Sequence, residues 1–216
     1  MNIAILGTGM VGAVVGKKLI DLGHKVMMGS RTSGNEKAVE WVKKCGANAS
    51  AGKFSEAAAF GEIIFLCTNG VVTIDAVRLA GKENFTGKTV IDITNPLDFS
   101  KGMPPTLIPE LSNTNSLGEE VQKTLPDAKV VKTLNTVNCE IMIEPSKLSE
   151  ETSIYLSGND ATAKEKVTEI LRSFGWMSII DLGDITTARG TEMMLPLWIR
   201  LWGALKTGHF NFKIVK

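Results

Sequence analysis

The sequence predicts an α/β protein built on a doubly wound, mostly parallel Rossmann sheet, with extra C-terminal strands and a C-terminal helix. Short, almost entirely apolar runs alternate with amphipathic helical segments, a pattern typical of a parallel sheet that helices cover on both faces. A glycine-rich turn follows the first apolar run and opens the first helical segment. We expect the 216 residues to form a single domain, with a core over 1–150 and a C-terminal extension over 151–216.

The expected elements follow one another in the order of such a fold. Asn2–Leu6 predicts the first strand, and apolar residues at helical spacing over 10–22 predict the first helix. A second strand is expected over 25–29, followed by a loop over 30–34 and a helix over 36–44. The later expected elements are strands over 63–67, 89–93, 128–134, 153–157 and 177–182 and a helix over 161–174.

Composition and charge exclude several classes of protein. With 44% apolar and 22% charged residues, the chain has the composition of an ordinary globular domain. Its 24 basic and 23 acidic residues leave a net charge of +1, so we expect no nucleic-acid partner. Cys45, Cys67 and Cys139 lie far apart without a Cys-x-x-Cys or neighbouring His pattern, which predicts neither a disulfide framework nor a metal site.

No segment of the sequence is expected to meet a membrane. The start of the chain has no basic leader, and its apolar run is too short for a signal peptide. The longest apolar stretch, over 193–205, is interrupted by Pro196, Arg200 and Gly203 and is shorter than the roughly 20 residues that span a bilayer. The sequence therefore predicts a cytoplasmic protein.

The glycine-rich turn predicts a phosphate-binding site. Gly7-Thr8-Gly9-Met10-Val11-Gly12 fits the pattern G-x-G-x-x-G and lies between the first strand and the first helix, where a dinucleotide-binding turn occurs. Gly7 permits the tight turn, Gly9 lets the backbone approach a pyrophosphate, and Gly12 lets the helix pack closely on the strand. The helix N-terminus supplies free N–H groups for the anion. The turn therefore predicts a bound dinucleotide.

The end of the second strand indicates which dinucleotide is bound. Proteins specific for NAD normally place Asp or Glu there, whereas this chain has Ser30, Arg31 and Thr32. Arginine can form a bidentate, charge-assisted contact with a 2′-phosphate, and the two hydroxyl groups can add hydrogen bonds. The alternative is that Arg31 is a solvated loop residue. We expect NADP(H) to be preferred over NAD(H).

No side chain is predicted to act as a catalytic acid, base or nucleophile. His24 belongs to the turn before the second strand, at the amino-terminal edge of the sheet, opposite the edge where ligands bind. His209 could face the site, but a position on the surface explains it at least as well. Tyr155 is the only tyrosine and has no Tyr-x-x-x-Lys pattern. Because no side chain is predicted to transfer protons, the redox partner is expected to be a small organic cofactor that carries its own chemistry.

The loops after three later strands are expected to line the nicotinamide. Their asparagines could bond the ribose or the carboxamide, or could instead cap helices and turns. Cys67 is better explained as buried packing than as a nucleophile, because no cationic neighbour is visible to lower its pKa. The candidate residues are Cys67, Thr68, Asn69, Asn95, Pro96, Leu97, Asn135 and Thr136.

Taken together, several segments resemble a known family, the NADPH-dependent deazaflavin (coenzyme F420) oxidoreductases and their relatives, including the cytosolic part of the STEAP metalloreductases. The matching pieces are 7–12, 28–31, 92–97, 130–136 and 190–215. The resemblance implies hydride transfer between NADP(H) and a deazaflavin or flavin, with 8–11 at the pyrophosphate and Ser30 and Arg31 at the 2′-phosphate. It also implies that Phe210 lies near the nicotinamide and that the protein forms a homodimer.

The C-terminal segment and the wider function leave alternatives open. Large apolar residues surround most of a helix over 193–202, which predicts burial on several sides, either in the core or in a homodimer interface. A reductase of a small carbonyl or imine substrate is a second candidate function. Only about forty residues remain after the start of the last predicted strand, however, and these would have to build the substrate pocket. A non-catalytic NADPH-binding or sensing module is a third.

Overall fold

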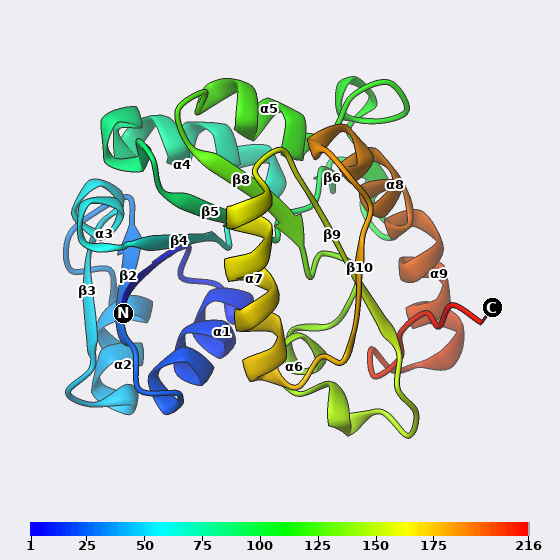
Figure 1. Ribbon diagram of the computed structural model, residues 1–216, viewed down its shortest axis with the longest axis horizontal. Coiled ribbons are helices and arrows are strands. Elements are labelled where there is room, and N and C mark those ends of the chain that lie inside the picture. The colour runs from blue at the N-terminus through cyan, green and yellow to red at the C-terminus, as the bar shows by residue number, and fades with distance from the viewer. Residues whose placement is uncertain (216) are drawn as a thin grey trace.

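The computed structural model describes residues 1–215, so Lys216, the last residue of the expected C-terminal extension, lies outside the described residues. Its centre is an eight-stranded sheet in the order β10-β9-β8-β5-β4-β1-β2-β3, which confirms the predicted Rossmann architecture (Figure 1). The sheet strands are β1 (Asn2–Leu6), β2 (Lys25–Ser30), β3 (Ala49–Lys53), β4 (Ile63–Leu66), β5 (Thr89–Asp92), β8 (Lys129–Thr133), β9 (Ser153–Gly158) and β10 (Ser178–Asp181).

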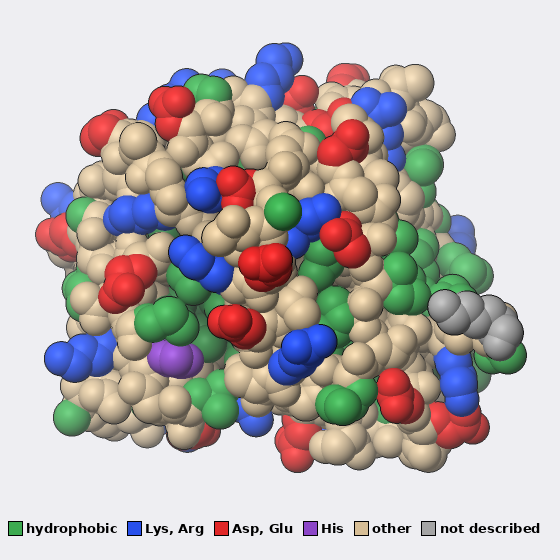
Figure 2. All heavy atoms as spheres, in the orientation of Figure 1, with side chains coloured by type: hydrophobic (Ala, Val, Ile, Leu, Met, Phe, Trp, Pro, Cys, Tyr) green, Lys and Arg blue, Asp and Glu red, His purple; other side chains and the backbone are tan. Residues whose placement is uncertain are grey.

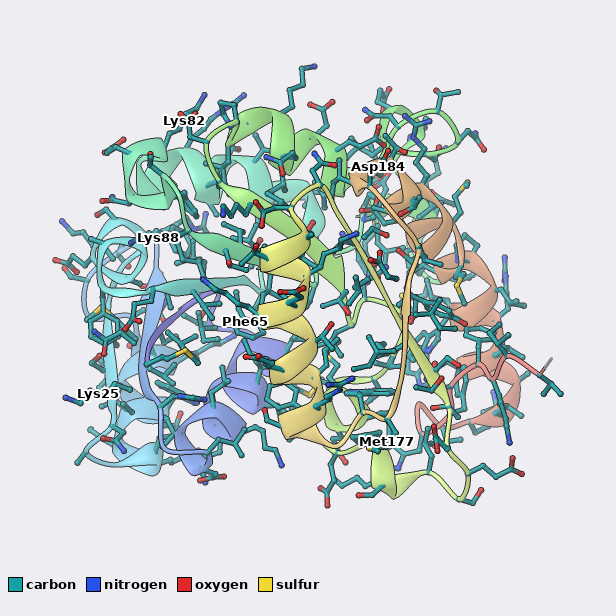
Figure 3. The ribbon with its side chains drawn as sticks, in the orientation of Figure 1. Lys25, Phe65, Lys82, Lys88, Met177 and Asp184 are labelled. Atoms are coloured by element: carbon teal, nitrogen blue, oxygen red, sulfur yellow. The ribbon has the colours of Figure 1, made fainter. Side chains whose placement is uncertain are left out.

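Helices cover both faces of this sheet, and each face has its own hydrophobic core. One core joins α1, α2, α6 and α7 to the sheet, and the other joins α3, α4, α5 and α8. Side chains of β4 alternate between the two, with Phe65 in the first and Leu66 in the second. Figure 3 shows Phe65 in the interior, whereas Lys25, the first residue of β2, lies at the periphery. The helices are α1 (Met10–Asp21), α2 (Glu36–Cys45), α3 (Phe54–Phe60), α4 (Thr73–Ala80), α5 (Leu117–Thr124), α6 (Cys139–Ile143), α7 (Ala161–Phe174), α8 (Ala188–Met193) and α9 (Leu195–Leu205).

Local sequence explains where several helices begin and end. The side chain of Asn35 accepts a hydrogen bond from the Ala38 N–H at the start of α2, and Asp160 does the same for Ala163 at the start of α7. Helix α7 ends at Gly175, whose φ of 105° is a left-handed conformation that favours glycine. These caps fix the boundaries that apolar periodicity alone leaves open.

Some elements were not predicted, because their sequences carry little apolar periodicity. Strand β3 has the sequence Ala-Ser-Ala-Gly-Lys and pairs with β2 at the edge of the sheet. A two-stranded antiparallel sheet, β6 (Leu97–Asp98) and β7 (Thr106–Leu107), closes the loop over 99–105. Both elements are held by backbone pairing rather than by a buried side-chain face.

The C-terminal extension departs from the prediction in its helices. Strand β9 pairs antiparallel with β8, and β10 pairs parallel with β9, so the extension continues the same sheet. The expected apolar helix over 193–202 is two helices, α8 and α9, and within α9 only Leu195 and Ile199 are buried. The prediction of burial on several sides is therefore wrong for the single chain. Figure 2 shows apolar side chains on the edge of the molecule where Figure 1 places α9 and the C-terminus.

The topology fixes where a ligand would lie. Strands β1 and β4 are neighbours but are separated in sequence by two further strands, so the connections diverge between them. In open α/β sheets this divergence leaves a crevice at the carboxyl ends of the strands, and ligands bind in it. The loops after β1, β2, β4, β5 and β8 all reach this edge of the sheet.

Candidate functional site

The turn between β1 and α1 leaves an open anion site. Gly9 is the N-cap of α1, and among the described residues no side chain bonds to its cap position. A Cβ on Gly9 would meet no heavy atom within 4 Å, so the N-terminus of α1 faces free space. Gly7, with φ of 133°, packs so closely that a Cβ there would lie 2.5 Å from the Cys67 carbonyl oxygen. The free N–H groups and the open face fit a pyrophosphate.

A cavity of about 500 Å³ extends from this turn to the end of β2. Arg31 is exposed on its wall and forms no ion pair with any described residue. The Ser30 hydroxyl is buried and donates to the Thr32 carbonyl oxygen at 2.6 Å, so it must rotate to contact a ligand. The cavity is lined by Gly7, Thr8, Gly9, Ser30, Arg31, Thr32, Asn35, Phe54, Cys67, Thr68, Asn69 and Val72.

The loop after β4 forms the adjoining wall. Burial raises the pKa of the Cys67 thiol well above its ordinary range, and the nearby Asp92 carboxylate adds to this. Cys67 is therefore a packing residue rather than a thiolate nucleophile. Thr73 donates its hydroxyl hydrogen to the Asn69 carbonyl oxygen at 3.1 Å and contacts the Thr68 hydroxyl at 2.9 Å, so Thr68 donates to Thr73 and keeps free lone pairs. The Asn69 side chain caps a short 3-10 helix over Gly70–Val72.

The loops after β5 and β8 are joined to each other. Asn95 donates its side-chain amide to the Asn135 carbonyl oxygen at 2.9 Å, and Asn135 donates to the Asn95 side-chain oxygen at 3.0 Å. A Cβ on Gly70 would overlap the Asn95 carbonyl oxygen, so the loop after β4 packs directly against the same residue. Leu134 precedes Asn135 with φ of 60°, a strained left-handed conformation for a leucine. We call the segments 94–96 and 134–137 the platform.

The remaining predicted residues lie on or near the platform. Pro96 is buried, and Leu97 begins β6. The Thr136 hydroxyl is buried and has no hydrogen-bond partner among the described residues, so it has capacity for a ligand. Phe210 stacks on Trp198 of α9 with ring centroids 5.2 Å apart and does not line the cavity of the phosphate turn. Gly208 lies against Asn138, the residue that follows the platform, so the C-terminal segment passes next to it.

The chemistry of these residues fits the phosphate groups of NADP(H). The open face of Gly9 and the N-terminus of α1 suit the pyrophosphate, and the unpaired Arg31 suits a 2′-phosphate. Sequence reasoning missed Asn35, Phe54 and Val72, which line the cavity from the N-cap of α2, the start of α3 and the 3-10 helix after β4. Of these, Asn35 carried a signal, because it directly follows the predicted loop over 30–34.

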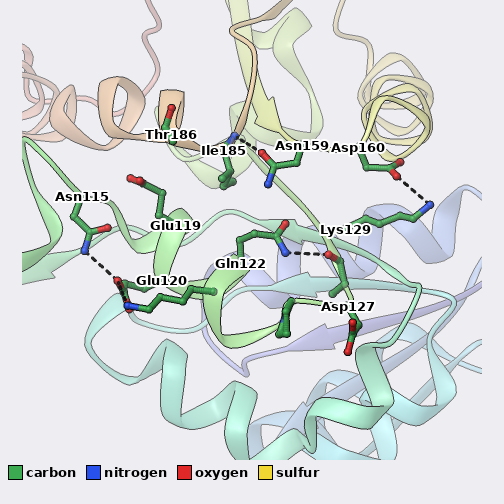
Figure 4. A pocket seen from close by; sticks show the side chains of 13 residues that line it. Asn115, Glu119, Glu120, Gln122, Asp127, Lys129, Asn159, Asp160, Ile185 and Thr186 are labelled. Carbon is green, nitrogen blue, oxygen red and sulfur yellow. Dashed lines mark hydrogen bonds and ion pairs between the residues drawn. The ribbon is translucent and has the colours of Figure 1, made fainter.

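A larger hollow lies elsewhere and is not this site. It has a volume of about 960 Å³ and lies between α5, the start of β8 and the end of β9, at the amino ends of the parallel strands (Figure 4). Among its charged groups, Lys129 pairs with Asp160 at 3.2 Å and Lys123 with Glu120 at 3.8 Å. Across residues 1–215 there is no cluster of three or more metal-ligating side chains. None of the described helices has the length and apolar character to cross a bilayer.

Comparison with known proteins places these features in a family. The family model described as "NADP oxidoreductase coenzyme F420-dependent" matches residues 2–96. The F420-dependent NADP reductase of Methanocaldococcus jannaschii is 31% identical over 211 residues, which cover 93% of this chain and 92% of the relative.

Solved structures agree on the fold. A crystal structure of a protein from Arthrobacter sp. FB24, described as a "putative f420 dependent nadp-reductase", is 50% identical with a TM-score of 0.95, and the match covers 100% of both chains. An imine reductase from Bacillus cereus is 19% identical with a TM-score of 0.63, matching 95% of this chain and 62% of its own, and shares the fold alone. Because it is 31% identical to an F420-dependent NADP reductase over 93% of its length, the chain belongs to the family of F420-dependent NADP reductases.

Proposed function

We propose that this protein transfers a hydride between NADP(H) and the deazaflavin coenzyme F420. The observation that carries the proposal is an open phosphate turn followed by an unpaired Arg31, in a chain that is 31% identical to an F420-dependent NADP reductase over nearly its full length. The two ring systems supply the redox chemistry when bound, since a hydride leaves the nicotinamide and joins the deazaflavin. The protein contributes proximity and orientation.

Each part of the site has a proposed task. The N–H groups at the start of α1 would hold the pyrophosphate, with Gly9 leaving room for it. Arg31 would bind the 2′-phosphate, joined by Ser30 after its hydroxyl turns away from Thr32. The Thr136 hydroxyl, buried without a partner among the described residues, would bond the carboxamide or the deazaflavin. The platform would fix the ring planes.

The proposed reaction is tested by anaerobic oxidation of NADPH with F420, FMN, FAD and riboflavin offered separately, with NADH as the control donor. We expect turnover with F420 and NADPH. Turnover with a flavin but not with F420 would show that the acceptor is a flavin and not a deazaflavin. NADPH binding without turnover would contradict the proposed reaction and favour a sensing module or another small substrate.

Arg31 is expected to set the preference for NADP(H). Arg31→Asp removes the bidentate donor and places a carboxylate beside the 2′-phosphate, so affinity for NADPH should fall about tenfold to a hundredfold, the equivalent of one charged hydrogen-bonded contact. Affinity for NADH should change little. Isothermal titration with both nucleotides measures the ratio of the two dissociation constants, and an unchanged ratio would show that Arg31 is only a surface cation.

We further propose a cytoplasmic homodimer in which each chain is one NADP-binding domain. Strands β9 and β10 continue the nucleotide-binding sheet, which supports a single domain. Apolar side chains on α9 and the C-terminal segment, including Leu197, Trp202 and Leu205, are exposed in the single chain and support burial by a second copy. Light scattering on the wild type and on Trp202→Glu tests the dimer, because a charge in that interface should favour the monomer.

A further inference from the structure

A buried lysine lies beneath the platform with all of its hydrogen-bond capacity used. The Lys132 ammonium, on β8, contacts Asp92 Oδ2 at 3.0 Å, Glu192 Oε1 at 2.7 Å and the Thr94 carbonyl oxygen at 2.6 Å. The side chains of the lysine and of both carboxylates are at most 1% exposed. An ammonium group has three donors, so these three acceptors satisfy it completely.

The Glu192 carboxylate reaches this site from the C-terminal extension. It belongs to α8, and it accepts the backbone N–H groups of Leu117 at 2.8 Å and Gly118 at 2.9 Å, which open α5. Three donors therefore converge on one carboxylate, and the helix N-terminus adds partial positive charge. Burial raises the pKa of Glu192, while Lys132 and the Leu117 N–H act in the opposite direction.

The lysine is held in its charged form by the same contacts. Burial lowers the pKa of Lys132, but the carboxylates of Asp92 and Glu192 outweigh this effect and keep the pKa above its ordinary value. Burying three charges costs more than an apolar replacement would, so stability alone is a weak explanation for them. The position of the group suggests a reason.

The contacts of Lys132 lead directly to the platform. Thr94, whose carbonyl oxygen receives one of its hydrogen bonds, is followed by Asn95, which bonds Asn135 in the loop after β8. Asp92 also accepts both the N–H and the hydroxyl of Thr94, at 2.9 and 2.6 Å. The network therefore holds Thr94 through its carbonyl oxygen, its N–H and its hydroxyl, while the amide pair holds Asn95 against Asn135.

We propose that Glu192 is a positioning residue for hydride transfer, acting through Lys132 on the backbone of Thr94 and so on the Asn95–Asn135 platform. The inference rests on the proposed function and gives the C-terminal extension a role separate from the expected contact of Phe210 with the nicotinamide. Helix α9 follows α8 with one intervening residue, Met194, so a shift of α9 would move Glu192 relative to the platform.

A second ion pair between the same helices provides a matched control. Arg189 of α8 forms two hydrogen bonds to the Glu119 carboxylate of α5, at 2.8 and 2.5 Å. This pair also joins α8 to α5, but it lies nearer the surface and has no hydrogen bond to the platform. If Glu192 only held the two helices together, its replacement and that of Glu119 would have the same consequences.

The experiment compares Glu192→Gln with Glu119→Gln. For Glu192→Gln we expect the single-turnover rate of NADPH oxidation by F420 to fall about tenfold to a hundredfold, the cost of a misplaced ring. The deuterium isotope effect on that step should rise, and the dissociation constant of NADP⁺ should change by less than about threefold. Glu119→Gln should keep the wild-type rate and isotope effect.

Hydrogen exchange with NADP⁺ bound tests the inference without turnover. Backbone amides over 93–97 and 134–137 should exchange faster in Glu192→Gln than in the wild type and in Glu119→Gln. Equal rates and equal exchange in the two variants would overturn the proposal. Lack of F420 turnover by the wild type would contradict the proposed function alone, because the exchange comparison still decides the role of Glu192. If Glu192→Gln does not fold, Glu192→Asp, which keeps the charge on a shorter side chain, replaces it in both measurements.

Discussion

The two halves of the candidate site are built in opposite ways. In the glycine-rich turn and the loop after β2, no described side chain caps the N-terminus of α1, and Arg31 forms no ion pair with any described residue. On the platform, the side-chain amides of Asn95 and Asn135 bond across the loops, and the lysine beneath has three acceptors. Open polar groups gain partners when a ligand binds, whereas satisfied groups hold a shape. We therefore expect one half to provide affinity for the ligand and the other to orient it.

The largest effect is expected from removing the cation beneath the platform. Lys132→Met leaves Asp92 and Glu192 buried side by side without a positive charge, which should lower the free energy of unfolding by about 3–5 kcal/mol. Urea denaturation at pH 7 measures the change. Lys129→Met, which removes the partly exposed pair with Asp160 from the same strand, is the control and should cost less than about 1 kcal/mol. Similar losses in both variants would show that the buried network has no special role.

The second prediction concerns how tightly the platform is packed. Gly70→Ala places a methyl group onto the Asn95 carbonyl oxygen, so one of the two loops must move. We expect a loss of about 1–3 kcal/mol in the free energy of unfolding, the usual cost of overpacking. Thermal and urea denaturation measure this loss. An unchanged thermal midpoint would mean that the two loops can move apart without a cost in stability.

Gly9→Ala, the matching substitution in the glycine-rich turn, should leave stability unchanged and weaken NADP⁺ binding. The methyl group of Gly9→Ala would meet no heavy atom within 4 Å, so the free energy of unfolding should stay within about 0.5 kcal/mol of the wild type. The methyl group would occupy the proposed position of the pyrophosphate, so affinity for NADP⁺ should fall about tenfold to a hundredfold. Titration calorimetry with NADP⁺ measures this, and unchanged affinity would place the pyrophosphate elsewhere.

This contrast also explains how much the sequence could predict. Within the open half, the glycine-rich turn and Arg31 both follow recognisable strand ends, so the sequence pattern pointed to residues that line the cavity, whereas Phe54 and Val72, which come from later elements, were missed. The platform joins residues far apart in the chain, since Asp92, Lys132 and Glu192 meet only after β5, β8 and α8 pack together. A charged residue in a strand or helix carries no sign that it will be buried. The apolar α9 misled prediction for the same reason, because its burial depends on what surrounds it.

The smallest expected effect comes from the surface pair that joins α8 to α5. The side-chain hydrogen bonds from Arg189 hold the pKa of Glu119 below its ordinary value in the folded chain. A carboxyl group whose pKa is lower folded than unfolded adds stability that is full above its unfolded pKa, about 4.3, and disappears as the pH falls through the folded value. The wild type should therefore exceed Glu119→Gln by about 1 kcal/mol in urea denaturation at pH 7. Near pH 3 the difference should shrink. An equal difference in unfolding free energy at both pH values would mean that packing of the Glu119 side chain, and not its charge, stabilises the fold. The Arg189–Glu119 pair would then differ from the Glu192 contacts in the nature of its stabilisation as well as in its burial.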